Sequence, residues 1–215
     1  MATSTGEPAE QTSPDNPAPG PRVPGPPGRP PRPHRLRLLD PLRQRDFGLL
    51  WVGMTASLIG DGLYFVAIAW QVLDLSDRPS ALSIVGVAWT VPQLLFLLIG
   101  GVLTDRLDRR TVLIGSDVVR GVAIGVLGVL SIAGTLVLWH VVVLVAIYGA
   151  AEAFFMPAFG AIVPDLVPSD MLVQANSLDQ FVRPVALRLV GPALGGLVIA
   201  GLGVGWAFIF DAASF

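Results

Sequence analysis

The sequence has no cysteine and no lysine, and only 14% of its 215 residues are charged. Without cysteine there is no disulfide framework, no cysteine-ligated zinc site and no thiol nucleophile. A soluble domain usually carries about 25% charged residues, so the low charge excludes a soluble enzyme. With a net charge of −2, the chain also lacks the basic surface of a nucleic-acid-binding protein.

Long apolar runs fill most of the chain instead. All fourteen basic residues are arginine, and seven of them precede Phe47. From Phe47 to Phe215 the apolar runs are interrupted mainly by single charges, and about 20 such residues are enough to cross a bilayer. The composition therefore predicts an all-α integral membrane protein that is surrounded by lipid.

The first 35 residues differ from the rest. Eleven of the nineteen prolines lie between Met1 and Pro33, where one valine and one methionine are the only large apolar residues. Such a segment buries too little apolar surface to offset the entropy of ordering, and it lacks the apolar core of a signal peptide. We expect residues 1–35 to form a disordered, proline-rich cytoplasmic tail and residues 36–215 to form the membrane domain. A proline-rich ligand for a partner domain is the alternative interpretation of the tail.

The apolar runs predict five complete membrane spans and an incomplete sixth. A polar turn separates the first two spans, the charged loop TDRLDRR follows the second, and Gly134-Thr135 follows the third. The sequence ends ten residues into the last helix, so we expect a membrane domain that is truncated within helix six. The predicted spans are about 47–73, 81–103, 111–133, 136–162, 178–200 and 206–215.

The positions of the arginines predict the orientation, because arginine accumulates in short cytoplasmic loops. Seven arginines lie before the first span and three lie in the loop after the second, whereas the opposite side has only Arg78. We therefore place the N-terminus and the loops after spans two and four in the cytoplasm. The leucine- and arginine-rich stretch His34–Asp46 would lie at the anionic membrane surface. The short loops leave no room for a catalytic domain, so we do not expect an enzyme.

Charged residues inside the spans are the candidates for function, because each costs roughly 2.5–3.5 kcal/mol on insertion scales. Asp61 lies near the middle of the first span and Glu152 lies past the middle of the fourth. A carboxyl in a low-dielectric cavity can carry a proton near neutral pH, so both are candidates for proton carriage or substrate binding. The alternative is that they form structural ion pairs. Arg188 needs a partner on another helix, for which either carboxylate would serve, and Gln93 and Tyr64 are further candidates to line the cavity.

Two other sets of buried charges are spaced to pair within one helix. Asp117 and Arg120 are three residues apart on the third span, and Asp179 and Arg183 are four apart on the fifth. Residues three or four apart lie on the same helix face. We therefore expect two structural ion pairs that orient helices.

The loop after the second span, GGVLTDRLDRRTVL, carries a recognisable motif. It resembles the signature loop between helices two and three of the major facilitator superfamily. Asp108 stands where many members have glycine, in a form, DRxDRR, that is similar to a subgroup of bacterial drug, macrolide and siderophore exporters. The residues that match the signature are Gly101, Asp105, Arg106, Arg109 and Arg110.

The chemistry of this loop fits a gate. Gly101 allows helix two to pack closely, and Asp105 can face a helix N-terminus. Arg109 and Arg110 can hold carboxylates on neighbouring helices, in a latch that is made in one state of alternating access and broken in the other. A loop that is basic only because it is cytoplasmic would explain the arginines but not the glycine and the aspartate.

A second, partial motif lies in the fifth span. The stretch GPALGG resembles the second half of the helix-five motif of antiporters in the same superfamily, while leucines occupy the earlier glycine positions of that motif. A Gly-Pro step followed by two glycines permits a bend and close helix packing, which can also be purely structural. The residues concerned are Gly191, Pro192, Gly195 and Gly196.

The resemblance covers about residues 36–215 and carries implications of its own. Superfamily members have twelve helices in two halves that rock around a site at the bilayer midplane. The chain resembles the N-terminal six-helix half, truncated within helix six, and it would require the missing C-terminal half as a partner. The implied function is proton-coupled efflux of hydrophobic or amphipathic small molecules by alternating access in the bacterial cytoplasmic membrane, without cofactor or metal.

Two other function classes are open at this stage. The first is a non-transport membrane module that acts in assembly or regulation through its proline-rich tail. The second is a membrane-embedded enzyme, which is disfavoured because the sequence offers no nucleophile, metal-binding cluster or phosphate-binding loop. A specific protein that is captured by the tail would favour the first of these classes.

Overall fold

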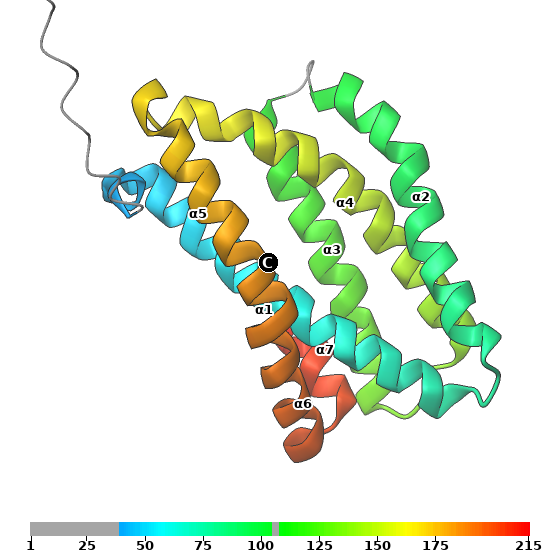
Figure 1. Ribbon diagram of the computed structural model, residues 1–215. Helices are drawn as coiled ribbons and strands as arrows, with labels where there is room; N and C mark the ends of the chain where they lie inside the picture. The colour runs from blue at the N-terminus through cyan, green and yellow to red at the C-terminus, as the bar shows by residue number, and fades with distance from the viewer. Residues whose placement is uncertain (1–38, 105–107) are drawn as a thin grey trace, which may run out of the picture. The chain divides into compact units, whose positions relative to one another are not determined.

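Helices make up the membrane domain in the computed structural model, which describes residues 39–104 and 108–215 (Figure 1). No strand occurs within these two ranges, so the predicted all-α fold is confirmed. The tail predicted for residues 1–35 lies outside the described part. The longer helices are α1 (Arg45–Leu75), α2 (Ser80–Thr104), α3 (Arg109–Ile132), α4 (Leu138–Leu166), α5 (Leu172–Val185), α6 (Gly191–Leu202) and α7 (Val204–Ala212).

Five helical stretches of the described chain are long and apolar enough to cross a membrane. Four of them correspond to α1, α2, α3 and α4, close to the ranges predicted from the sequence. The fifth, Ser169–Leu202, joins the short 3-10 helix η2 (Ser169–Met171), α5, the π-helical segment η3 (Ala186–Val190) and α6 into one continuous rod. Helices satisfy most of their backbone donors and acceptors internally, as a bilayer requires.

The fifth stretch begins earlier than the predicted start at residue 178. α5 begins at Leu172, and its first two turns are amphipathic, with Ala175 buried and Val173 and Asn176 exposed. The exposed polar residues lower the hydropathy of this segment, so an apolar window does not include it. α4 also runs past its predicted end at residue 162 to Leu166, because only Pro168 forces the preceding residue out of the helical conformation.

Glycines bring α1 into close contact with α6. A Cβ atom added to Gly191 would lie 2.6 Å from the Cα of Gly62 and 2.6 Å from the carbonyl oxygen of Ile59, and one added to Gly195 would lie 3.1 Å from the Cα of Leu63. Such distances leave no room for a side chain, so the two backbones touch here. Gly196, in contrast, has open space where its Cβ would stand.

This difference predicts the effect of a methyl group at each position. Gly191→Ala forces α1 and α6 apart, and we expect it to destabilise the domain by about 1–3 kcal/mol, the usual range for overpacking. Gly196→Ala meets nothing and is the matched control. Thermal unfolding of the detergent-solubilised protein measures both. Equal melting temperatures for the two variants would contradict the close contact.

α7 packs between α1 and α3. A Cβ atom on Gly205 would lie 3.1 Å from the carbonyl oxygen of Gly128 on α3, so the two helices also cross closely. α6 ends at Leu202, and the next residue, Gly203, has a φ of 97°, a left-handed conformation that other residues rarely adopt. The turn at Gly203 sends α7 back against α1 and α3, as Figure 1 shows.

Two apolar cores lie along α1. One contains Met54 and Leu58 near the beginning of the helix, and the other contains Tyr64 and Ala67 further along. Asp61 lies between them on the same helix and is itself buried. Asp61, a polar candidate of the sequence, therefore lies at the junction of the two cores.

Candidate functional site

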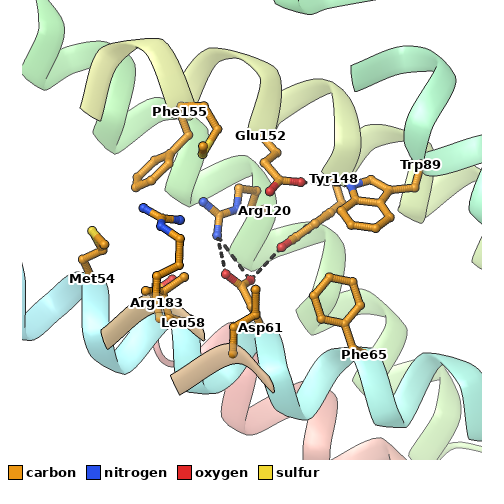
Figure 2. A pocket seen from close by; sticks show the side chains of 13 residues that line it. Met54, Leu58, Asp61, Phe65, Trp89, Arg120, Tyr148, Glu152, Phe155 and Arg183 are labelled. Carbon is orange, nitrogen blue, oxygen red and sulfur yellow. Dashed lines mark hydrogen bonds and ion pairs between the residues drawn. The ribbon is translucent and has the colours of Figure 1, made fainter. Parts of the chain in front are cut away.

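A cavity of about 120 Å³ lies at this junction, and its walls come from α1, α2, α3, α4, α5 and η3 (Figure 2). Its walls combine large apolar or aromatic side chains with charged ones, as small-molecule sites generally do. The apolar lining includes Met54, Leu58, Phe65, Trp89, Phe155 and Met156, and the charged lining consists of Asp61, Arg120, Glu152 and Arg183.

Asp61 is the most heavily bonded carboxylate of the cavity. The hydroxyl of Tyr148 on α4 donates a hydrogen bond of 2.6 Å to its Oδ1, and Arg120 on α3 lies 3.4 Å from the same oxygen. Figure 2 shows both interactions converging on the one carboxyl group. Only 8% of Asp61 is exposed. The residue therefore links α1 to two other helices through its charge.

Arg120 is shared between two carboxylates. Besides Asp61 it contacts Asp117 at 3.5 Å, the pair predicted from their spacing on α3. Aromatic rings cover its guanidinium, with the ring centre of Phe215 at 4.2 Å and that of Phe155 at 4.9 Å. A cation above an aromatic face is stabilised electrostatically, so this environment holds the guanidinium in place between its two acidic partners.

Glu152 has a different environment. One of its carboxylate oxygens accepts a hydrogen bond of 2.9 Å from the indole nitrogen of Trp89 on α2. Within residues 39–104 and 108–215, Glu152 belongs to no ion pair. Arg183, the other cation of the cavity, contacts Asp179 at 3.4 Å, as the sequence predicted. Glu152 is therefore the cavity carboxylate that has no cationic partner among the described residues.

Arg188 does not take either partner considered for it. It is exposed on the π-helical segment, and the ion pairs among the described residues do not include it. The partner of Asp61 is Arg120 instead. Arg188 lies within the π-helical segment Ala186–Val190, so the rotation per residue of a regular α-helix does not describe where this arginine points relative to Arg183.

Two other cavity candidates lie outside the lining. Tyr64 is fully buried in the core behind the cavity, where its ring stacks on that of Tyr148 with centres 5.1 Å apart. Gln93 is half-buried on α2 and does not line this cavity. Tyr64 supports the position of the tyrosine that donates to Asp61, so it acts from behind the cavity rather than in it.

Part of the predicted gating loop is described. Gly101 lies within α2, while Asp105 and Arg106 lie outside the described residues. Arg109 begins α3 and contacts α4, with its guanidinium 2.5 Å from Asp165 and 2.8 Å from the carbonyl oxygen of Ala161. An arginine of the motif thus holds a carboxylate on a neighbouring helix. The side chains of this pair are 44% and 61% exposed, and exposed pairs contribute only about 0–1 kcal/mol, so the contact breaks at low cost.

Asp108 has a clear structural role at the same end. Its Oδ2 accepts hydrogen bonds from the hydroxyl of Thr111 at 2.8 Å and from the backbone nitrogen of the same residue at 3.0 Å. These bonds cap the N-terminus of α3 and hold the pKa of the Asp108 carboxyl below its usual range. The aspartate that replaces the common glycine of the motif is therefore an N-cap, which remains ionised at neutral pH. Arg110 beside it is exposed.

Sequence reasoning missed two residues near the cavity. Trp89 donates the hydrogen bond to Glu152, and Asp211 on α7 is completely buried, with 0% exposure. Asp211 lies in the apolar stretch WAFIFDAASF, so the rule that singled out Asp61 would also have found it. No comparable signal marked Trp89, because an indole in an apolar helix is usually an ordinary core or lipid-facing residue.

Comparisons with known proteins agree with the membrane architecture. A family model described as "Transmembrane secretion effector" matches residues 37–215. Macrolide efflux protein A of Streptococcus pyogenes is 29% identical over 152 residues, which cover 71% of this chain and 37% of that protein. Multidrug efflux pump Tap of Mycolicibacterium fortuitum is 34% identical over 161 residues, 72% of this chain and 39% of the pump.

A third relative comes from another genus. The MFS-type transporter YfiS of Bacillus subtilis is 28% identical over 178 residues, which cover 81% of this chain and 41% of the transporter. The chain thus spans about two fifths of the length of these curated relatives. No solved structure matches the chain.

Proposed function

Because the chain belongs to the major facilitator superfamily, in the family described as transmembrane secretion effectors, we propose that it forms part of a proton-coupled exporter of hydrophobic or amphipathic small molecules that works by alternating access. The observation that carries the proposal is the Asp61 carboxylate, which is buried, bound by Arg120 and Tyr148, and placed at an aromatic-lined cavity. Efflux relatives support the direction of transport.

The coupling follows from competition for one carboxyl group. A proton and Arg120 both bind to Asp61, and a proton neutralises the charge that holds the guanidinium. Arg120 then retains its ion pair with Asp117, which is on the same helix. The ion pair with Asp61, which joins α3 to α1, is lost. Protonation therefore loosens α1 from α3, a change that favours one arrangement of the helices over the other.

The cavity supports the class of substrate. Aromatic and methionine side chains such as Phe65, Phe155 and Met156 give apolar contact, and Glu152 offers a negative charge without a cationic partner in the described chain. A cavity of about 120 Å³ is smaller than the roughly 300–1,000 Å³ of drug-sized sites. We therefore propose that a second six-helix half completes the wall, as in the two-half architecture of the superfamily.

We place this exporter in the bacterial cytoplasmic membrane with its N-terminus in the cytoplasm. The beginning of α1, the beginning of α3, and the connection of α4 to α5 lie at the same end of the helices (Figure 1). Arg45, Arg109 and Arg110 belong to that end. Arginine-rich ends face the cytoplasm, so this arrangement supports the proposed orientation.

Inverted membrane vesicles that contain the full-length transporter test the proposal. The vesicles are acidified inside, the pH gradient is followed with acridine orange, and ethidium or erythromycin is added as the probe. Proton-coupled export takes up the probe and releases protons, so we expect partial recovery of the acridine orange fluorescence. Probe uptake that persists after a protonophore has collapsed the gradient would refute proton coupling. No uptake of either probe would refute export of this substrate class.

Glu152→Gln separates substrate binding from proton carriage. If the carboxylate binds the positive charge of a substrate, its loss weakens the binding of cationic ethidium at least about tenfold, which corresponds to roughly 1.4 kcal/mol. The binding of uncharged lipophilic probes is then unchanged. If the carboxylate carries protons instead, the coupled transport of every probe falls by the same factor. Trp89→Phe is the matched control, because it removes the hydrogen bond to Glu152 but keeps the charge. Wild-type kinetics for all probes in Glu152→Gln would exclude both roles.

A further inference from the structure

Asp211 is the most deeply buried carboxyl of the described chain. It is 0% exposed, and neither of its carboxylate oxygens has a hydrogen-bond partner within residues 39–104 and 108–215. Asp61, in contrast, receives a tyrosine hydroxyl and an arginine. An isolated ionised carboxylate in such a place would cost far more than a neutral acid, and buried groups of this kind take up a proton instead.

The cations of the cavity are already engaged in ion pairs. Arg120 is shared between Asp61 and Asp117, and Arg183 pairs with Asp179. Neither cation lies within salt-bridge distance of Asp211. The helices around the cavity therefore hold more carboxyl groups than cations, and Asp211 is the one that lacks both a cation and a hydrogen-bond donor among the described residues.

The contact between α7 and α1 explains why a carboxyl can lie there. A Cβ atom on Gly60 would lie 2.5 Å from Oδ1 of Asp211 and 3.2 Å from its Cα. The absence of a side chain at Gly60 thus allows the Asp211 carboxyl to reach the backbone of α1. The next residue along α1 is Asp61. The Asp211 carboxyl therefore contacts α1 directly beside the residue that carries the second carboxyl group. A charge on both at once would be unfavourable.

We propose that Asp211 is a second proton-binding carboxyl of this membrane domain, which holds its proton when α7 is packed against α1 and gives it up when the two helices separate. The proton passes to water that enters between the helices, and the carboxylate that remains is then solvated. The inference deepens the proposed proton-coupled transport and rests on it. In the packed arrangement, Asp61 would be ionised beside Arg120, and Asp211 would be protonated beside Gly60.

The charged and titratable groups that face Asp211 come from two of the helices packed against α7. α1 contributes Asp61 and Tyr64, and α3 contributes Arg120. α6 has no titratable residue. The hydroxyl of Ser214 lies beside the Asp211 carboxyl at Gly60 and donates its hydrogen bond of 2.8 Å to the backbone carbonyl oxygen of Asp211. Asp61 is therefore the one nearby group whose charge directly opposes ionisation of Asp211.

Infrared spectroscopy of the full-length transporter in lipid tests the protonation without any substrate. A protonated carboxylic acid has a C=O stretch that is distinct from the carboxylate bands and shifts in D₂O. We expect Asp211→Asn to remove one such band at neutral pH. Asp179→Asn is the matched control, because that carboxylate is paired with Arg183 and we expect its loss to leave the acid bands unchanged.

Asn has nearly the shape of a neutral aspartic acid, so we expect Asp211→Asn to fold with an unchanged melting temperature. If it does not fold, Asp211→Glu keeps the acid and should shift the band instead of removing it. An unchanged acid region in both variants, with loss of a carboxylate band in Asp211→Asn, would show that Asp211 is ionised and would overturn the inference.

The test of Asp211 can fail independently of the proposed proton-coupled transport. In the vesicle assay, we expect Asp211→Asn to slow proton-coupled efflux at least tenfold, because its neutral amide cannot release a proton. If Asp211→Asn shows coupled efflux at the wild-type rate, Asp211 has no role in transport. The proposed proton-coupled transport is not contradicted by that result. Absence of coupling in the wild type refutes the proposed function, and the infrared band still decides whether Asp211 binds a proton.

Discussion

We expect Asp61→Asn in the full-length transporter to abolish the proposed proton-coupled efflux, while the protein is made and inserted at the wild-type level. Asparagine retains the shape of the side chain and an oxygen that can accept the hydrogen bond of Tyr148. It cannot bind a proton, and it carries no charge to hold Arg120. We expect the coupled rate to fall at least about a hundredfold, the scale on which proton-transfer groups contribute.

The measurement is recovery of acridine orange fluorescence in acidified inverted vesicles, normalised to the amount of transporter. Asp179→Asn removes a carboxylate that is paired on its own helix and serves as the control for loss of a charge. Exchange of labelled probe at equilibrium needs no net proton movement, so the Asp61→Asn variant should retain it. Wild-type coupled efflux in both Asp61→Asn and Glu152→Gln would reject the assignment of these carboxyls as proton carriers.

Asp61 could be singled out from the sequence as a buried charge without any tertiary information. A charge in the middle of an apolar span is costly wherever the helix packs, so Asp61 and Glu152 stand out in the linear sequence. The same holds for the pairs on single helices, since Asp117 and Arg120 are fixed on one face by the geometry of the α-helix. These features depend only on local spacing.

The partners across helices were not predictable in this way. Asp61 and Arg120 are 59 residues apart, and their contact depends on how α1 and α3 are rotated and where they cross. The sequence suggested Arg188 as a partner, but Arg188 lies in a π-helical segment, where the rotation per residue differs from that of an α-helix. Trp89 escaped notice for a similar reason, because nothing local indicates that its N–H points at Glu152.

The boundaries of the spans also differ in whether the sequence alone could predict them. α1, α2 and α3 follow the apolar runs, because a bilayer selects continuous hydrophobicity. The amphipathic beginning of α5 does not follow them, since its apolar side packs on protein while its polar side is exposed. Close approaches such as Gly62 against Gly191 also need the fold, although the Gly-Pro motif indicated that this part of the fifth span packs tightly.

Arg120→Gln has the largest expected effect on stability. The guanidinium is 3% exposed and contacts Asp61 and Asp117, so its removal leaves two carboxylates near one another without a cation. Breaking a buried pair by removing one partner typically costs about 3–5 kcal/mol. Thermal unfolding in detergent should show this loss. Arg183→Gln, which removes a more exposed cation, is the matched control and should cost much less.

The double variant Arg120→Gln/Asp61→Asn decides whether the loss comes from the charges. If the uncompensated carboxylate is the cause, neutralising Asp61 restores much of the stability, and the two changes together cost less than their sum. A loss that persists undiminished would instead trace to the aromatic packing of the Arg120 side chain against Phe155 and Phe215. In the first case, the cycle measures the free energy with which the ion pair joins α1 to α3. Under the proposed mechanism, this is the free energy that a proton on Asp61 would release.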